Sequence, residues 1–139
     1  MIKIRCIAVD DEPPALRQME EYIRQVPYLD LLGSFSNPMD TLGFLKENKV
    51  DLIFLDIQME QFTGLELLKL LKNQPKIILT TAYDSYALQA FDLEVDDYLL
   101  KPISFDRFCK ATERIYNDLN LVSQMKSGNV TINSDELDY

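Results

Sequence analysis

The sequence contains no histidine and only two cysteines, Cys6 and Cys109. Histidine is the commonest general base of enzymes, and zinc sites are built from histidines and closely spaced cysteines, so the composition argues against both kinds of site. Cys6 lies in an apolar run and Cys109 in an expected helix, which indicates two reduced structural thiols. Any chemistry must therefore depend on carboxylates, hydroxyl groups, lysine and main-chain groups.

Long apolar runs are also missing. No run approaches the roughly 20 residues that a membrane-spanning helix requires, and the segment Met1–Arg5 lacks the apolar stretch and cleavage site of a signal peptide. We therefore expect a cytoplasmic protein with no membrane partner. The net charge of -9 repels phosphate backbones, so we expect this fragment to bind no nucleic acid itself.

The 139 residues fit a single globular domain, in which short apolar runs alternate with segments of helical periodicity. We expect strands over residues 4–9, 29–35, 76–81 and 97–100, and a further strand within 50–59. A helix is expected after each strand, the fourth of them over 84–91. Strict alternation is typical of an α/β domain, whose parallel strands are joined by right-handed crossovers.

Several residues mark helix starts, either as prolines suited to a first turn or as side chains suited to an N-cap: Pro13, Pro14, Asn37, Pro38, Thr63 and Ser104. The expected core stripe of the last helix comprises Phe105, Phe108, Thr112, Ile115, Leu119 and Val122. This periodicity fades after about Met125. We therefore expect a domain over residues 1–125 and a linker or tail over 126–139 that leads to a C-terminal domain absent from this chain.

The apolar run Leu52–Leu55 stops at Asp56. A strand buried on both faces carries an acid only where it leaves the core, so Asp56 is expected at the carboxyl end of its strand, where open α/β sheets bind ligands. If the strands are ordered 2-1-3-4-5, the order reverses between the first and third strands, and a crevice opens there. The other polar residues that end strands are Asp10, Asp11, Thr80, Thr81 and Lys101.

Asp10, Asp11 and Asp56 should meet at this crevice. Three neighbouring carboxylates repel one another, and a hard divalent cation such as Mg²⁺ removes that cost. A carboxylate, a cation, a lysine and a hydroxyl group are what phosphoryl transfer onto an aspartate requires. Taken singly, each residue also has a plain structural interpretation, such as acidic capping of the first helix by the Asp10-Asp11-Glu12 run.

At these residues the chain resembles the receiver domain of bacterial two-component response regulators, over residues 2 to about 123. The resemblance implies a doubly wound, flavodoxin-like sheet of five parallel strands ordered 2-1-3-4-5. It implies a phosphoacceptor with metal-dependent self-phosphotransfer and self-dephosphorylation, not an enzyme with turnover. The motifs that carry it are Val9-Asp10-Asp11-Glu12, Leu55-Asp56-Ile57-Gln58-Met59, Thr81-Ala82 and Leu100-Lys101-Pro102.

The resemblance also assigns roles to single residues. Asp56 is the expected site of phosphorylation. Mg²⁺ or Mn²⁺ is expected on Asp10, Asp11, Asp56 and the backbone carbonyl of Gln58. Thr81 and Lys101 are expected to contact the phosphoryl group, Tyr98 to be an aromatic switch, and the Lys101–Pro102 bond to be cis.

The stretches Thr80–Phe91 and Asp97–Pro102 are similar to the LytR/AlgR-type regulators, which join a receiver to a C-terminal LytTR DNA-binding domain. This implies a sensor histidine kinase as partner, a transcriptional output, and DNA as a partner of the full-length protein. A homodimer is a further hypothesis. It would form through the face made of the fourth helix, fifth strand and fifth helix, whose charges are of both signs: Asp84, Glu94, Asp97, Asp106, Arg107, Lys110 and Arg114.

Two other classes of protein compete with this interpretation. A metal-dependent phosphatase of the haloacid dehalogenase type also uses an aspartate at a strand end, but it needs a second acid two residues on, where this chain has Gln58. A flavodoxin-like electron carrier needs a phosphate-binding loop after the first strand. Here that position holds Asp10-Asp11-Glu12-Pro13-Pro14, which repels phosphate.

Overall fold

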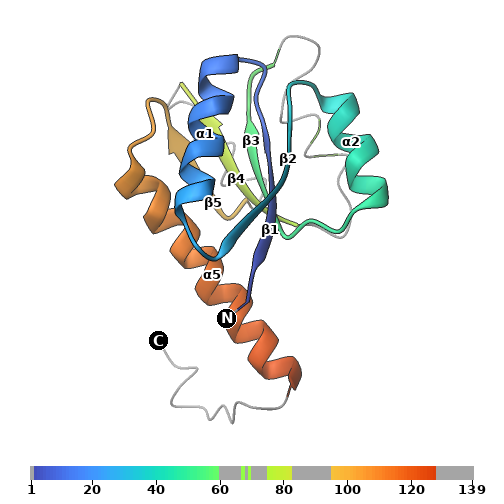
Figure 1. Cartoon of the computed structure of the whole chain (residues 1–139), viewed down its shortest axis with the longest axis vertical. Helices are drawn as coiled ribbons and strands as arrows, with labels where there is room; N and C mark the ends of the chain where they lie inside the picture. The colour runs from blue at the N-terminus through green and yellow to red at the C-terminus, as the bar shows by residue number, and fades with distance from the viewer. Residues whose placement is uncertain (1, 60–66, 68, 70–74, 83–94, 128–139) are drawn as a thin grey trace.

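Figure 1 shows the computed structural model of the chain, which describes residues 2–59, 67, 69, 75–82 and 95–127. The expected third helix, with Thr63 and Glu66 at its start, and the expected fourth helix over 84–91 lie outside the described residues. The described elements are β1 (Ile4–Val9), α1 (Pro13–Gln25), β2 (Leu29–Phe35), α2 (Pro38–Glu47), β3 (Leu52–Asp56), β4 (Lys76–Thr81), β5 (Asp97–Leu100) and α5 (Phe105–Ser127).

The five strands form one parallel sheet in the order β2-β1-β3-β4-β5. This confirms the doubly wound, flavodoxin-like α/β fold. The order reverses between β1 and β3, which lie side by side in the centre of the sheet. The carboxyl ends of these two strands are therefore the topological switch point of the fold.

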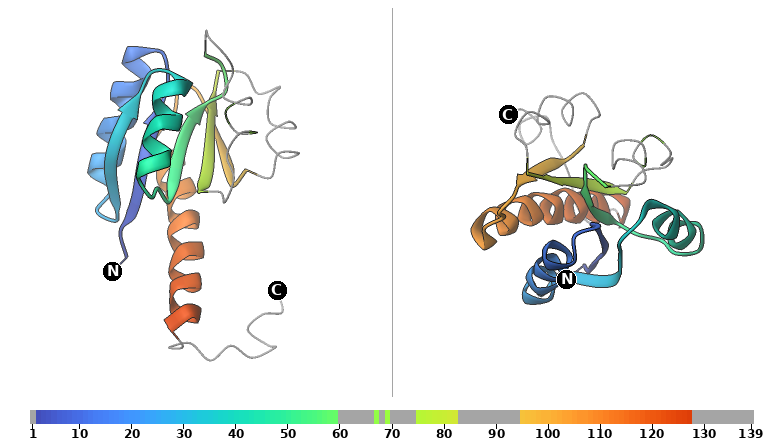
Figure 2. Two further views of the ribbon diagram at one scale, coloured as in Figure 1. Left: turned by 90° about the vertical axis from the view of Figure 1, so that its right-hand side faces the viewer. Right: turned by 90° about the horizontal axis from the view of Figure 1, so that it is seen from above.

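Helices cover both faces of the sheet (Figure 2). On one face, Met19 and Ile23 of α1 and Phe108 and Ile115 of α5 pack in one apolar cluster with alternate residues of the strands, such as Phe54. On the other face, Leu42 and Leu45 of α2 pack against a second cluster. Because β3 is buried along its whole length, its run of apolar residues has contacts on both sides.

The helix starts follow the sequence signals. Pro13 and Pro14 occupy the first turn of α1. The Asn37 side chain accepts a hydrogen bond of 2.8 Å from the Asp40 N–H and so caps α2. Ser104 does the same for α5, where its hydroxyl accepts from the Arg107 N–H at 3.1 Å.

The expected core stripe of α5 is wrong at Val122. Phe108, Thr112 and Ile115 are buried, but 46% of Val122 is exposed. The physical reason is visible in Figures 1 and 2, where the last turns of α5 continue beyond the end of the sheet and find no strand to pack against. The helix also runs to Ser127, two residues past the expected domain end at 125.

The apolar spacing of Leu16, Met19, Ile23 and Val26 predicts one buried stripe on the first helix. Val26 is buried, but it lies just beyond α1, which ends at Gln25, and its N–H donates to the Ile23 carbonyl where the helix terminates. Both cysteines are free thiols, and burial raises the pKa of Cys6 to about 12. None of the described helices is both long and apolar enough to cross a membrane.

Candidate functional site

The polar residues expected at the strand ends meet at one edge of the sheet. Asp56 is the last residue of β3, and its Cα is paired with that of Thr80 on β4. Asp10 and Asp11 directly follow β1, the neighbour of β3 on its other side. One carboxylate oxygen from each of the three aspartates lies within 4.8 Å of the others. The predicted meeting of Asp10, Asp11 and Asp56 is therefore confirmed.

Lys101 completes this cluster from the end of β5. Its ammonium Nζ lies 2.8 Å from Asp10 Oδ2 and 3.7 Å from Asp56 Oδ1. It also lies 3.6 Å from Glu12 Oε1. The strand ends alone predicted Lys101 at this edge, but its close pairing with Asp10 and its proximity to Glu12 emerge only from the structure.

The site is buried, and its charges are strongly coupled. Burial, and then the charge of Asp10, raise the pKa of the Asp56 carboxyl from 3.8 to about 7, against the opposing effect of Lys101. Burial by itself would lower the pKa of Lys101, but its hydrogen bond to Asp10 and the charge of Asp56 more than compensate and raise it. The group that the sequence singles out as nucleophile is thus a carboxyl whose negative charge is costly in this site.

Main-chain hydrogen bonds hold the two buried aspartates in place. Asp10 Oδ1 accepts from the Glu12 N–H at 2.9 Å, and Asp56 Oδ1 accepts from the Gln58 N–H at 3.3 Å. Glu12 is the N-cap residue of α1 but makes no capping hydrogen bond with its side chain. Asp10 therefore serves the cluster in this structure, and a capping role for the Glu12 side chain is not supported by a contact.

The donor set fits a hard divalent cation. It consists of carboxylate oxygens, with no histidine in the chain, which is the chemistry preferred by Mg²⁺ and Mn²⁺. A pocket of about 260 Å³ opens beside the cluster. It is lined by Asp10, Thr80 and Lys101 together with residues of α1, Gln18 among them, and of the loop after β5. This pocket gives a small anionic group access to the charged residues.

The remaining site residues lie on β4 and β5. Thr81 is buried at the end of β4, and its carbonyl accepts a hydrogen bond of 2.7 Å from the Lys101 N–H. Tyr98 is partly buried and packs against the apolar cluster that also contacts α2. The Lys101–Pro102 peptide bond is cis, as expected.

Comparison with known proteins places these features in a family. The family model described as the response regulator receiver domain matches residues 6–113. A response regulatory protein of Shewanella oneidensis is 40% identical over 118 residues, which is 84% of this chain and 50% of that protein. The sensory transduction protein LytT of Bacillus anthracis is 33% identical over 92% of this chain and 55% of its own length. The transcriptional regulatory protein BtsR of Escherichia coli is 36% identical over 81% of this chain and 48% of its own length.

Solved structures agree with these relatives. The response regulatory domain of mrkE from Klebsiella pneumoniae is 32% identical, with a TM-score of 0.78 over 85% of this chain and 99% of that one. The response regulator TrrA of Thermotoga maritima, solved in complex with Mg²⁺ and BeF, is 28% identical, with a TM-score of 0.72 over 81% of this chain and 98% of that one.

The chain spans about half the length of the curated relatives it matches. LytT and BtsR are regulators of the LytTR type, in agreement with the resemblance seen in the sequence. Neither the phosphatase nor the electron-carrier alternative is favoured by these matches. The chain belongs to the response regulator receiver domains.

Proposed function

We propose that this receiver domain accepts a phosphoryl group on Asp56 from a sensor histidine kinase and so switches a transcriptional output domain. One observation carries the proposal. Asp56, with a side chain only 4% exposed, lies in a cluster with two further aspartates and has the Lys101 ammonium 3.7 Å from its carboxylate. Asp56 is thus a carboxylate nucleophile with a positive charge, Lys101, beside it and with two further carboxylates that could hold a cation.

In the proposed reaction, a carboxylate oxygen of Asp56 attacks the phosphorus of a phosphohistidine. The O–P bond forms as the P–N bond breaks, and the leaving imidazole takes up a proton. Lys101 holds a positive charge where the phosphoryl oxygens arrive. Asp10, Asp11, Asp56 and the Gln58 carbonyl would hold Mg²⁺ or Mn²⁺, which supplies further charge neutralisation when bound. The acceptor is modified once and then dephosphorylated, so the domain has no outside substrate to turn over.

The proposal is tested by intact-mass spectrometry. Incubation with Mg²⁺ and acetyl phosphate should add one phosphoryl group, and Asp56→Asn should abolish the adduct. Asp30→Asn is a matched control, because Asp30 is an exposed carboxylate on β2 outside the cluster, and it should leave the adduct intact. An adduct that persists in Asp56→Asn would place the acceptor elsewhere.

Activation would follow from the charge added at the ends of β3, β4 and β5. Thr81 and Lys101 would move toward the phosphoryl group, and Tyr98 would reorient in response. This puts the bistable element at β5 and α5. DNA binding would belong to the part of the full-length protein that this chain does not contain.

We also propose that activation favours a homodimer through the face that includes β5 and α5, although the structure changes the charge pattern behind this idea. Asp97, Arg107 and Arg114 pair within the chain, and Asp84 and Glu94 lie outside the described residues. Among the described residues of the original set, Asp106 and Lys110 are the exposed charges left for a partner.

Sedimentation with and without Mg²⁺ and beryllofluoride tests the dimer. A phosphoryl mimic should shift the protein from monomer toward dimer at tens of micromolar. A protein that stays monomeric in both states would remove the dimer and leave the phosphoacceptor proposal standing.

A further inference from the structure

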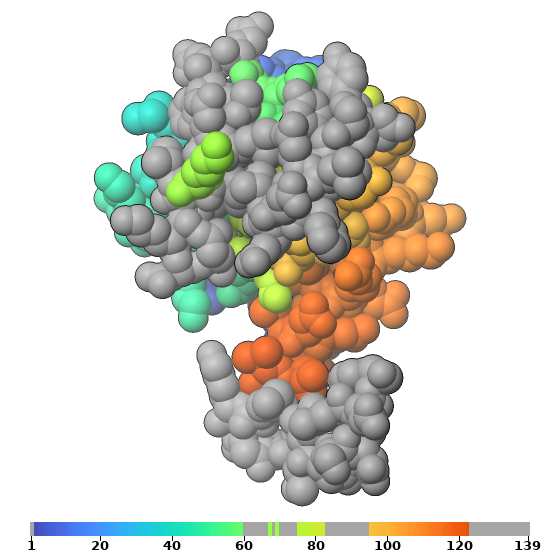
Figure 3. All heavy atoms as spheres, turned by 180° about the vertical axis from the view of Figure 1, so that it is seen from behind, coloured from blue at the N-terminus to red at the C-terminus, as the bar shows by residue number. Residues whose placement is uncertain are grey.

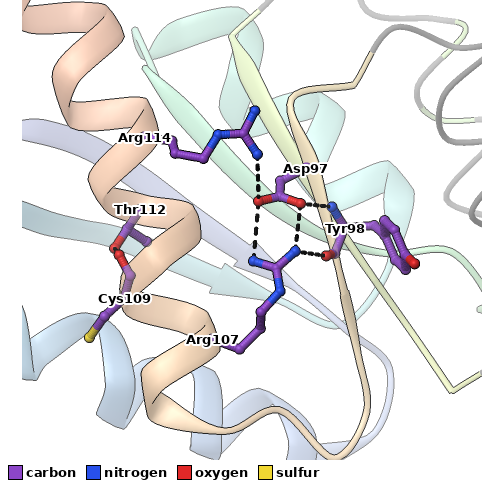
Figure 4. Close-up of polar contacts among 6 residues, drawn as sticks. All are labelled: Asp97, Tyr98, Arg107, Cys109, Thr112 and Arg114. Carbon is purple, nitrogen blue, oxygen red and sulfur yellow. Dashed lines mark hydrogen bonds and ion pairs between the residues drawn. The ribbon is translucent and has the colours of Figure 1, made fainter.

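The first residue of β5 joins this strand to α5. Figure 4 shows the Asp97 carboxylate between two arginines of the helix. Arg107 donates to both oxygens, with Nη2–Oδ1 at 2.8 Å and Nη1–Oδ2 at 3.2 Å. Arg114 approaches Oδ2 from one side at 3.4 Å. The contact of Arg107 is the stronger one, because it is bidentate and shorter, whereas Arg114 makes a single, longer contact.

The same two residues also hold the main chain of Tyr98. The Tyr98 N–H donates to Asp97 Oδ1 at 2.8 Å, and the Tyr98 carbonyl accepts from Arg107 Nη2 at 3.0 Å. The Lys101 N–H, three positions on, bonds β4. Because main-chain groups alternate in direction along a strand, those of Tyr98 face away from β4, at the free edge of the sheet. Asp97 and Arg107 therefore satisfy the N–H and the carbonyl of Tyr98, beside which the described sheet has no further strand.

Burial distinguishes this contact from an ordinary surface ion pair. The Asp97 side chain is only 9% exposed, whereas Arg107 is 43% and Arg114 69% exposed. Exposed ion pairs add little stability. The Asp97–Arg107 pair does more than pair charges, because it fixes two hydrogen-bonding groups of one residue at the junction of strand and helix.

The side chain of Tyr98 is not held in this way. In Figure 4 its ring extends away from α5, while its main chain lies against the helix. A pocket of about 280 Å³ is lined by Tyr98, Leu100, Pro102, Ser104 and Arg107. This pocket lies beside the fixed main chain of Tyr98, on the side where Arg107 lies.

We propose that Asp97 and Arg107 are positioning residues for Tyr98. They hold the main chain of Tyr98 against α5. When the surroundings of Tyr98 change, its ring therefore rotates between two distinct orientations, and the strand does not shift. This inference rests on the assignment of Tyr98 as the switch under the proposed function. It adds that the ring and the start of α5 are coupled through one arginine.

The test is ¹⁹F NMR of protein labelled with 3-fluorotyrosine, with the Tyr98 signal identified by its loss in Tyr98→Phe. Spectra are recorded with and without Mg²⁺ and beryllofluoride. In the wild type the Tyr98 signal should move between two positions. In Arg107→Gln the two positions should converge or broaden into one averaged signal.

Arg114→Gln is the matched control. Within the described part of the chain, Arg114 pairs with Asp97 alone. Its substitution therefore removes one positive charge beside Asp97, as Arg107→Gln does, but leaves the main chain of Tyr98 held. The control should keep both Tyr98 positions, and urea unfolding should confirm that both variants are folded.

The outcomes separate the two claims. A Tyr98 signal that does not move in the wild type would overturn the switch assignment and this inference with it. A signal that moves equally in the wild type and in Arg107→Gln would overturn the positioning role alone. If the two Tyr98 signal positions are lost equally in Arg107→Gln and in Arg114→Gln, the effect depends only on positive charge near Asp97, which would also contradict the inference.

Discussion

Asp56 is the residue on which the proposed chemistry depends, and ionising its buried carboxyl group costs free energy. Its pKa is raised from 3.8 to about 7, first by burial and then by the charge of Asp10. A carboxyl whose pKa is higher in the folded state stabilises the fold at low pH and loses that contribution as the pH rises through the folded value. Without a metal, the acidic cluster should therefore destabilise the fold most above about pH 7.

The corresponding prediction concerns Asp56→Asn in the presence of a chelator. The variant should be more stable than the wild type at pH 8, because it has no carboxylate to ionise in the buried cluster. The advantage should shrink as the pH falls from 7 toward 4. Urea unfolding at a series of pH values measures this. A difference in stability that is the same at every pH would contradict the raised pKa.

At the scale of the elements, α5 consists of two parts with different environments. Its first half packs against the sheet through Phe108 and Ile115, while its last turns project beyond the sheet. The stability of the domain should therefore depend on the part of α5 that packs against the sheet, and hardly at all on its last turns.

A pair of truncations tests this difference. Ile115→Ala removes a side chain that is 1% exposed and should cost about 2–5 kcal/mol of unfolding free energy. Val122→Ala, at 46% exposure, should stay within about 0.5 kcal/mol of the wild type. Chemical denaturation measures both. Comparable losses in the two variants would show that the projecting turns are packed in solution.

The same helix shows what the sequence could and could not predict. Apolar periodicity identified the buried face of α5, with Phe108 and Ile115, because that face depends only on the helical repeat. It gave no information on where the sheet ends, so it extended the stripe to Val122. Strand bounds such as Ile4–Val9 were predictable, because apolar runs buried on both faces stop where the core stops.

The candidate site likewise has one part that the sequence predicted and one part that it did not. The meeting of Asp10, Asp11 and Asp56 follows from the strand ends, which the apolar runs indicate, and from the strand order, which the resemblance to receiver domains implies. The contacts of Asp97 and Arg107 with the main chain of Tyr98 were not predicted, because they depend on how close α5 lies to the edge of β5. One signal was present in the sequence: an acidic residue, Asp97, opens β5, and an arginine, Arg107, lies in the first turn of α5.

At the scale of the whole molecule, the proposed metal binding at the acidic cluster would be linked to folding. A cation that binds the folded state alone adds stability as its concentration exceeds the dissociation constant, by about 2.7 kcal/mol at a hundredfold excess. Mg²⁺ should therefore raise the melting temperature of this domain, whose net charge is -9.

Thermal unfolding across a Mg²⁺ titration measures this effect. Asp11→Asn should lose most of the rise, because it removes one of the three clustered carboxylates. Asp30→Asn removes a charge outside the cluster and should keep the full rise. If all three proteins gain equally, Mg²⁺ acts on general surface charge and not at the cluster.

The central claim is that the phosphoryl group is carried by Asp56 itself. The most direct measurement treats the Mg²⁺- and acetyl phosphate-modified protein with borohydride, which reduces an aspartyl phosphate to homoserine, and then locates the changed residue by peptide mass spectrometry. The account predicts homoserine at position 56, with Asp10 and Asp11 unchanged. Homoserine at either of those two positions, or no reduced residue in a protein that carries the phosphoryl group, would contradict it.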